Sequence, residues 1–226
     1  MEPLVTEYVV EFGRDGRPAE PDGRLDAAAF HRNHAPIWEV LEKFLAGKSG
    51  DVVEAGSGTG QHVVTFARYA PDITWWPSDL SDVHLKSIAA WRAQAGLPNI
   101  HPPLRIDLSD PDWFPAGVGP GKLLAILCAN VIHIAPWRVA EGLFAGAARL
   151  LRDDGRLFLY GPFKRDGKHT ALSNAVFDTS LREQDPEWGV RDIGDVEKVA
   201  GSVGLTLREV APMPANNLIL VFERLG

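Results

Sequence analysis

Glycines occupy every second position after a single glutamate in the segment Glu54-Ala55-Gly56-Ser57-Gly58-Thr59-Gly60. Because a glycine has no Cβ atom, a turn built from glycines can bend sharply and bring its backbone close to a ligand. A carboxylate at the end of a strand, as expected for Glu54, can pair with an ammonium group. A turn that binds a pyrophosphate needs its third glycine where this chain has Gln61, so the spacing disfavours a nicotinamide dinucleotide site. The alternative is a strand–helix turn that binds no ligand.

The spacing E-x-G-x-G-x-G resembles motif I of the class I S-adenosylmethionine methyltransferases. The resemblance implies S-adenosylmethionine as the cofactor, with Glu54 near its amino group. It also implies that the turn passes close to the methionyl and ribose parts of the cofactor at Gly56, Ser57, Gly58 and Gly60.

The ends of the next three predicted strands carry side chains suited to the same ligand. Asp79 follows Gly60 by about twenty residues, where a carboxylate can accept both ribose hydroxyls; the alternative is a turn or cap aspartate. By resemblance to the same superfamily, Asp107 contacts the adenine amino group and Leu108 packs on the ring. Asn130 ends the fourth predicted strand and faces the crevice in which open α/β sheets hold ligands.

Three side chains after the fourth and fifth predicted strands are candidates for chemistry on a methyl acceptor. His133 lies three residues beyond Asn130 and has a pKa suited to proton transfer. Tyr160 and His169 flank the segment after the fifth strand, on the expected acceptor side of the crevice. The alternatives are a structural histidine bonded to a helix end, a strand tyrosine with a satisfied hydroxyl, and an ordinary loop histidine.

A helix expected over residues 173–182 places polar and aromatic side chains on one face. Asn174, Phe177 and Asp178 share this face, which suits a small polar acceptor. Asn216, just before the last strand, is a further candidate for the same wall. The alternatives are a helix with Phe177 in the core and a simple turn at Asn216.

Strands and helices alternate along the chain, which predicts βαβ units and a mostly parallel sheet. We expect strands over 51–55, 73–76, 104–108, 123–129, 156–160, 205–210 and 218–222. We expect helices over 61–69, 83–94, 137–151, 173–182 and 192–203, and a polar loop over 162–170. A first helix is expected from Asp26, broken or restarted at Pro36 and ended by Gly47.

Length and composition fit one α/β domain. The chain has 226 residues, 45% of them hydrophobic, and a formal net charge of −7. This charge disfavours a nucleic-acid partner, because binding a polyanion requires a basic surface. We expect an irregular lead-in over residues 1–25 and a single domain over 26–226. The acidic segment Met1–Phe12 has no basic stretch typical of a secretory signal, and no apolar run is long enough to span a bilayer, so we expect a cytoplasmic protein.

Longer motifs resemble one particular family. They are Cys128-Ala129-Asn130-Val131-Ile132-His133-Ile134-Ala135-Pro136-Trp137, Tyr160-Gly161-Pro162-Phe163-Lys164-Arg165-Asp166-Gly167, His169-Thr170, Ser173-Asn174 and Met213-Pro214-Ala215-Asn216-Asn217. These motifs are similar to those of the family that includes methyltransferase-like protein 26. The resemblance implies a Rossmann-like class I methyltransferase fold, with a mostly parallel seven-stranded sheet, an antiparallel last strand and helices on both faces.

Two functions remain open from the sequence. The first is a methyltransferase that acts on a small-molecule acceptor. The second is a sensor or regulatory protein that binds S-adenosylmethionine or S-adenosylhomocysteine without catalysis. The glycine turn serves both, while the polar set of His133, Tyr160, His169 and Asp178 favours the enzyme. The acceptor and the oligomeric state stay unassigned.

Overall fold

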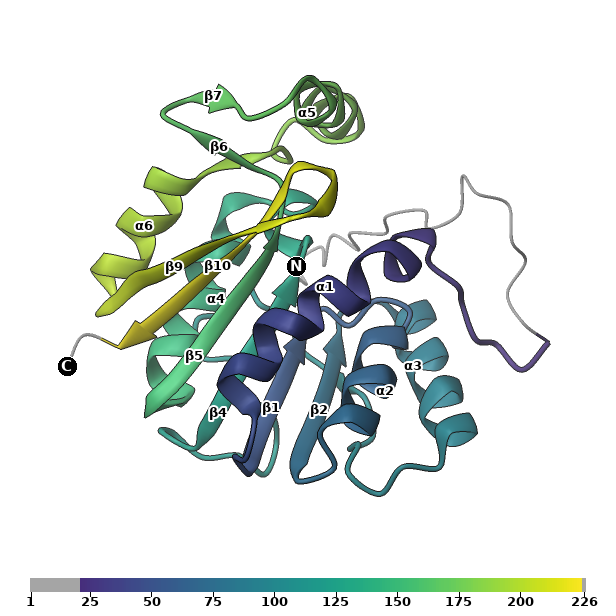
Figure 1. The fold of residues 1–226 in the computed structure, drawn as a ribbon. Helices are drawn as coiled ribbons and strands as arrows, with labels where there is room; N and C mark the ends of the chain where they lie inside the picture. The colour runs from purple at the N-terminus through teal and green to yellow at the C-terminus, as the bar shows by residue number, and fades with distance from the viewer. Residues whose placement is uncertain (1–20, 225–226) are drawn as a thin grey trace, which may run out of the picture.

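A seven-stranded sheet forms the centre of the computed structural model, which describes residues 21–224 (Figure 1). Its strands are β1 (Gly50–Ala55), β2 (Ile73–Asp79), β3 (Leu104–Arg105), β4 (Leu123–Ala129), β5 (Leu151–Gly161), β9 (Leu205–Met213) and β10 (Asn217–Arg224). Their order is β3-β2-β1-β4-β5-β10-β9. β10 runs antiparallel to both of its neighbours, β5 and β9, and the other neighbouring pairs are parallel. The predicted Rossmann-like methyltransferase sheet is confirmed.

Helices cover both faces of this sheet (Figure 1). On one face lie α1 (Ala28–Leu45), α2 (Gln61–Tyr69) and α3 (Asp82–Ala95); on the other lie α4 (Trp137–Leu150) and α6 (Ile193–Ser202). At the top of Figure 1, α5 (Leu172–Gln184) lies with a small sheet of order β7-β6-β8. These strands are β6 (Phe163–Arg165), β7 (Lys168–His169) and β8 (Arg191–Asp192). Two 3-10 turns, η1 (Val131–His133) and η2 (Pro214–Asn216), follow β4 and β9.

The alternation of side chains along the strands builds two separate cores. Val52 and Trp75 pack with α1 and α2, whereas their neighbours Val53 and Trp76 pack on the opposite face with α4. Successive strand residues point to opposite faces, so a strand covered on both sides must be apolar throughout. The run 123–129 meets this condition, and β4 lies between β1 and β5 with all but its last residue buried.

The prediction that Pro36 breaks the first helix was wrong, because α1 continues through it. A proline inside a helix removes its own amide donor and disturbs the preceding turn. Here Ile37, Val40 and Leu41 are buried against α2 and the sheet. Burial of this apolar stripe outweighs the lost hydrogen bond.

Two further expectations need correction. The third strand is only Leu104–Arg105, because Asp107 starts a turn in which its carboxylate accepts hydrogen bonds from the Ser109 amide (2.8 Å) and hydroxyl (2.7 Å). The segment 162–170 is not a plain loop: it contains β6 and β7, which pair antiparallel, and β6 also pairs parallel with β8.

The described part of the expected lead-in, residues 21–25, contains no helix or strand; residues 1–20 lie outside the described residues. Within 21–224, none of the helices has the length and apolar character that crossing a membrane requires.

Helix α4 packs unusually close to the segment after β3. A Cβ atom at Gly142 would lie 2.1 Å from the carbonyl oxygen of Leu108, and one at Gly146 would lie 2.2 Å from Nε1 of Trp113. The Trp113 indole also donates a hydrogen bond to the Gly142 carbonyl (2.9 Å). Glycines in α4 therefore fix the position of Leu108.

Gly142→Ala should lower the free energy of unfolding by roughly 1–3 kcal/mol, because the new methyl group overlaps a backbone oxygen. The matched control is Gly201→Ala on α6, where a Cβ atom meets nothing within 4 Å. There, alanine should raise stability by roughly 0.5–1 kcal/mol through its better helix propensity. Urea denaturation measures both. Equal effects of the two variants would contradict the close packing of α4.

Candidate functional site

A cavity of about 780 Å³ opens at the carboxyl ends of the parallel strands. Its wall is completed by the first turns of α1, by α5 and by the turn between β9 and β10. Open α/β sheets bind ligands at this edge, and the volume falls within the ~300–1,000 Å³ typical of small-molecule sites. Most predicted site residues line it: Glu54, Gly56, Ser57, Gly58, Asp79, Asp107, Leu108, Asn130, Tyr160, Asn174, Phe177 and Asn216.

The glycine turn after β1 adopts left-handed backbone conformations, with φ of 75° at Gly56, 55° at Gly58 and 88° at Gly60. These angles favour glycine. Gly60 does not line the cavity. A Cβ atom there would lie 2.8 Å from the Ile88 Cα, so this glycine lets α3 pack against the turn. Its predicted contact with a cofactor has no support in this position.

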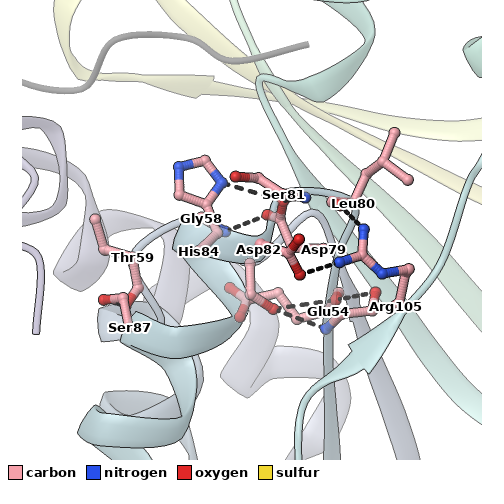
Figure 2. A network of polar contacts seen from close by, with 12 residues as sticks. Glu54, Gly58, Thr59, Asp79, Leu80, Ser81, Asp82, His84, Ser87 and Arg105 are labelled. Atoms are coloured by element: carbon pink, nitrogen blue, oxygen red, sulfur yellow. Dashed lines mark hydrogen bonds and ion pairs between the residues drawn. The ribbon is translucent and has the colours of Figure 1, made fainter. Parts of the chain in front are cut away.

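Asp79, at the end of β2, joins three segments through its carboxylate (Figure 2). Oδ2 accepts a hydrogen bond from the Gly58 amide (2.9 Å), and Oδ1 accepts one from the Ser81 amide (2.9 Å). His84 Nδ1 lies 3.1 Å from Oδ1. A carboxylate accepts about four hydrogen bonds, so roughly one position, on Oδ2, is left for a ligand. The expected pair of ribose hydroxyls exceeds this remaining capacity.

Glu54 places a buried carboxyl group beneath the turn. Its side chain is only 2% exposed, and Oε2 has no hydrogen-bond partner within the described part of the chain. Burial raises the pKa of Glu54 to about 8; a hydrogen bond with Ser57 opposes the shift, and the negative charge of Asp79 adds to it. An unpartnered buried carboxyl oxygen on a cavity wall is suited to a cationic ligand, which would supply the missing partner and favour the ionised form.

The adjoining strand ends add a polar and an apolar wall. Leu108 is buried at the cavity, and Asp107 beside it is exposed, with only Oδ1 used by Ser109. Asn130 has a left-handed backbone (φ 63°), and its amide donates to the Tyr160 carbonyl (2.8 Å). This bond joins the ends of β4 and β5 where both reach the cavity.

A polar group from α1 and α2, not predicted from the sequence, also lines the cavity. Arg32, Asn33 and His62 line the cavity beside Tyr160. Asn33 is buried, and its Oδ1 lies 2.8 Å from His62 Nε2. One signal was available: Asn33 precedes Ile37 by four residues, so a polar side chain stands in line with the apolar stripe of the helix.

His133 was expected to act on an acceptor, but the structure places it off the cavity wall. It is fully buried, packs edge-on against Phe163 with ring centroids 4.8 Å apart, and accepts a hydrogen bond from the Arg191 amide at Nδ1 (3.3 Å). Burial lowers the pKa of His133 to about 3, and the charge of Arg191 adds to the shift. This environment is typical of a structural histidine, and the ring does not line the cavity, although Nε2 has no hydrogen-bond partner among residues 21–224.

His169 and Asp178 also lie off the cavity wall. The Asp178 carboxylate is 6% exposed and already bound by Lys164 Nζ (2.7 Å), His169 Nε2 (3.2 Å), Arg182 Nε (3.3 Å) and the Val190 amide (2.7 Å). These contacts hold the pKa of Asp178 below its ordinary value despite the opposing effect of burial. These bonds join α5 to the small sheet, and neither side chain lines the cavity.

The other residues predicted on α5 do reach the cavity, together with the β9–β10 turn. Asn174 Nδ2 donates to the Asn216 carbonyl (3.0 Å), and Asn216 Nδ2 donates to the Ser173 hydroxyl (3.3 Å). Both Ala215 and Asn216 have positive φ, which bends the turn toward α5. Phe177 is partly exposed on the same wall.

The sheet order and the cavity at its edge define the class I methyltransferase fold, and solved structures agree. An O-methyltransferase family 2 protein from Planctomyces limnophilus DSM 3776, in complex with apigenin, matches with a TM-score of 0.71 at 18% identity, over 85% of this chain and 56% of that one. An O-methyltransferase family protein from Burkholderia thailandensis matches with 0.70 at 16% identity, over 84% and 55%. CalO1, a methyltransferase in calicheamicin biosynthesis in its SAH-bound form, matches with 0.62 at 16% identity, over 84% and 55%.

At these identities the likeness shows a shared fold, and this chain spans little more than half the length of each matched structure. A family model matches residues 24–224, and the chain belongs to that family, described as a protein of unknown function (DUF938).

Glu54→Gln should remove a pH dependence of stability. Between pH about 4.5 and about 8 the folded protein keeps a proton that an unfolded glutamate releases, so the free energy of unfolding of the wild type falls as pH rises through this window. The variant lacks this slope. As pH rises from 4.5 to 8, the free energy of unfolding of the variant should increase relative to that of the wild type by roughly 2–5 kcal/mol.

Urea denaturation of both proteins across this range measures the difference, with the exposed Glu209→Gln as control, which should keep the wild-type slope. Parallel curves for wild type and Glu54→Gln would show that Glu54 ionises normally in the folded protein.

Proposed function

We propose that this protein is an S-adenosylmethionine-dependent methyltransferase that acts on a small-molecule acceptor. The observation that carries the proposal is the unpartnered, buried Oε2 of Glu54 on the wall of the cavity, next to a glycine turn held by Asp79. A ligand with a positive charge and a hydroxyl group satisfies both acids, and S-adenosylmethionine has an ammonium, a sulfonium and a ribose. The net charge of −7 favours a small acceptor over a nucleic acid. A cytoplasmic location stays a prediction.

The cavity wall fits the rest of this cofactor. Asp79 Oδ2 has room for one ribose hydroxyl, Leu108 offers an apolar surface to a ring, and Asp107 Oδ2 is available to an exocyclic amino group. Asn130 adds an amide at the end of β4. Gly56 brings backbone close to the ligand without a Cβ atom. Two fold relatives described as SAH-bound and as bound to apigenin support a cofactor and a small-molecule acceptor in this kind of fold.

Bound S-adenosylmethionine supplies an electrophilic methyl group on a sulfonium. The work of this chain is then to hold cofactor and acceptor in line and to keep water away. Burial raises the pKa of Tyr160 above its ordinary value, so its hydroxyl stays protonated and orients a ligand as a hydrogen-bond donor. Asn174, Phe177 and Asn216 form the opposite wall, which suits the acceptor.

The alternative is a sensor that binds the same cofactor without catalysis. Of the polar set that favoured an enzyme in the sequence, only Tyr160 lines the cavity. The enzyme is now supported by the extent of the cavity, which continues from the acidic strand ends to α5 and the β9–β10 turn. The resemblance of the motifs at Asn130, Tyr160 and Asn216 to the methyltransferase-like protein 26 family supports the same function.

The purified protein should bind S-adenosylhomocysteine, and Glu54→Gln and Asp79→Asn should each weaken that binding by about tenfold or more, the scale of a hydrogen bond to a charged group. The matched control is Asp72→Asn, an exposed aspartate in the turn before β2, which should bind as the wild type does. Calorimetry measures the affinities, and release of S-adenosylhomocysteine from S-adenosylmethionine with pooled metabolites tests turnover. Binding of NAD without binding of S-adenosylhomocysteine would overturn the proposal.

His133→Ala should destabilise the protein without disturbing the ligand. Loss of the ring against Phe163 and of the acceptor for the Arg191 amide should cost roughly 2–4 kcal/mol of unfolding free energy. Affinity for S-adenosylhomocysteine, measured well below the melting temperature, should stay within about twofold of the wild type, because His133 does not line the cavity. If the variant keeps its stability but loses binding or turnover, His133 belongs to the functional site and is not a structural residue.

A further inference from the structure

The polar group on the α1 side of the cavity has a fixed direction of hydrogen bonding. Asn33 Oδ1 lies 2.8 Å from His62 Nε2, and an amide oxygen can only accept, so His62 donates and carries its proton on Nε2. Asn33 also acts on Tyr160: it lowers the pKa of Tyr160 against the larger, raising effect of burial. The bond between Asn33 and His62 holds the start of α1 at the cavity that Tyr160 also lines.

Tyr160 brings a hydroxyl group to the same cavity. A phenol donates through its proton, and burial, which raises the pKa of Tyr160, keeps that proton in place. Asn33 and Tyr160 are each only 5% exposed, so their positions are set by packing. Tyr160 therefore presents a positioned donor and calls for an acceptor atom on the ligand.

Arg32 presents further donors on the same wall. It directly precedes Asn33 in α1, lines the cavity, and its charge lowers the pKa of Tyr160. Among residues 21–224, no ion pair or hydrogen bond of the Arg32 side chain is formed, and Arg32 is the only lysine or arginine of the described cavity wall. A guanidinium has donors and no acceptor.

The charges of the cavity are thus separated. Glu54, Asp79 and Asp107 lie at the ends of the first strands, while the positive charge of Arg32 stands with Tyr160 on the α1 side. His62 adds no second charge, because burial lowers its pKa to about 4, with a further effect from His34. One positive charge and a neutral donor match a monoanion better than a phosphate monoester, which carries about two charges at pH 7.

We propose that Arg32 and Tyr160, which line the same cavity, form a carboxylate-binding subsite in it. A planar guanidinium fork binds a carboxylate through two parallel hydrogen bonds, and Tyr160 adds a third. The inference rests on the proposed function, within which two molecules carry a carboxylate: the methionyl part of the cofactor and an acidic acceptor.

The first arm of the test uses the cofactor product. Calorimetry compares S-adenosylhomocysteine with S-adenosyl-3-thiopropylamine, which keeps the amino group and lacks the carboxylate. If the cofactor supplies the carboxylate, wild type should prefer S-adenosylhomocysteine by about tenfold or more. Arg32→Gln should reduce this preference to within about twofold, and Tyr160→Phe should reduce it partly.

The second arm uses acceptor-like probes with S-adenosylhomocysteine at saturation. These are 4-hydroxybenzoate and hexanoate, each beside its own amide. If an acceptor supplies the carboxylate, wild type should bind one of the acids about tenfold more tightly than its amide. Arg32→Gln should abolish that preference while leaving the affinity for S-adenosylhomocysteine unchanged.

The controls are Arg68→Gln and Tyr69→Phe, which alter exposed side chains of α2 that do not line the cavity. Both should keep every wild-type preference. The proposal is overturned if S-adenosylhomocysteine binds and neither arm shows a preference that depends on Arg32. If wild type binds no S-adenosylhomocysteine, the proposed function fails, and the acid–amide pairs without it decide the subsite alone: an Arg32-dependent preference upholds it, and none overturns it.

Discussion

The hydrogen bond from the Gly58 amide to the Asp79 carboxylate is the contact on which the arrangement of the site depends. It joins the turn after β1 to the end of β2, and the same carboxylate holds the Ser81 amide and faces His84 on α3. A turn of left-handed glycines has many conformations in an unfolded chain. A charged acceptor that binds one of its amides favours a single conformation. The ends of β1 and β2 and the start of α3 are therefore held in fixed positions at the cavity.

Burial of the Glu54 carboxyl group at the cavity lowers the stability of the folded protein. Its carboxyl group lies beneath this turn, near the charge of Asp79, and half of its hydrogen-bonding capacity is unmet. Burying such a group costs free energy that the surrounding apolar packing must offset. A cationic ligand of the kind proposed above would offset this cost, because it would favour the ionised carboxylate.

The part of the structure formed by α5 and the small sheet is held together by charged and polar side chains. Asp178 gathers two basic side chains, a histidine and a backbone amide, and so joins α5 to the small sheet of β6, β7 and β8. His133 supports the same region from below through the Arg191 amide. Histidine and aspartate are the residue types expected of catalysis, but here their hydrogen bonds are used to hold one wall of the site in place.

The sequence by itself determined two features of this protein. The apolar run 123–129 had to form a central strand, and the alternate glycines after Glu54 had to form a turn at the end of the strand beside it. Each follows from backbone sterics and from burial on both faces, which act over a few residues. Only the tertiary structure decided that α1 continues through Pro36 and brings Asn33 to His62, and that His133 is buried in the interior. These outcomes depend on contacts between segments far apart in the chain, where the packing of a whole helix outweighs one residue's preference and the available partners decide the role of a side chain.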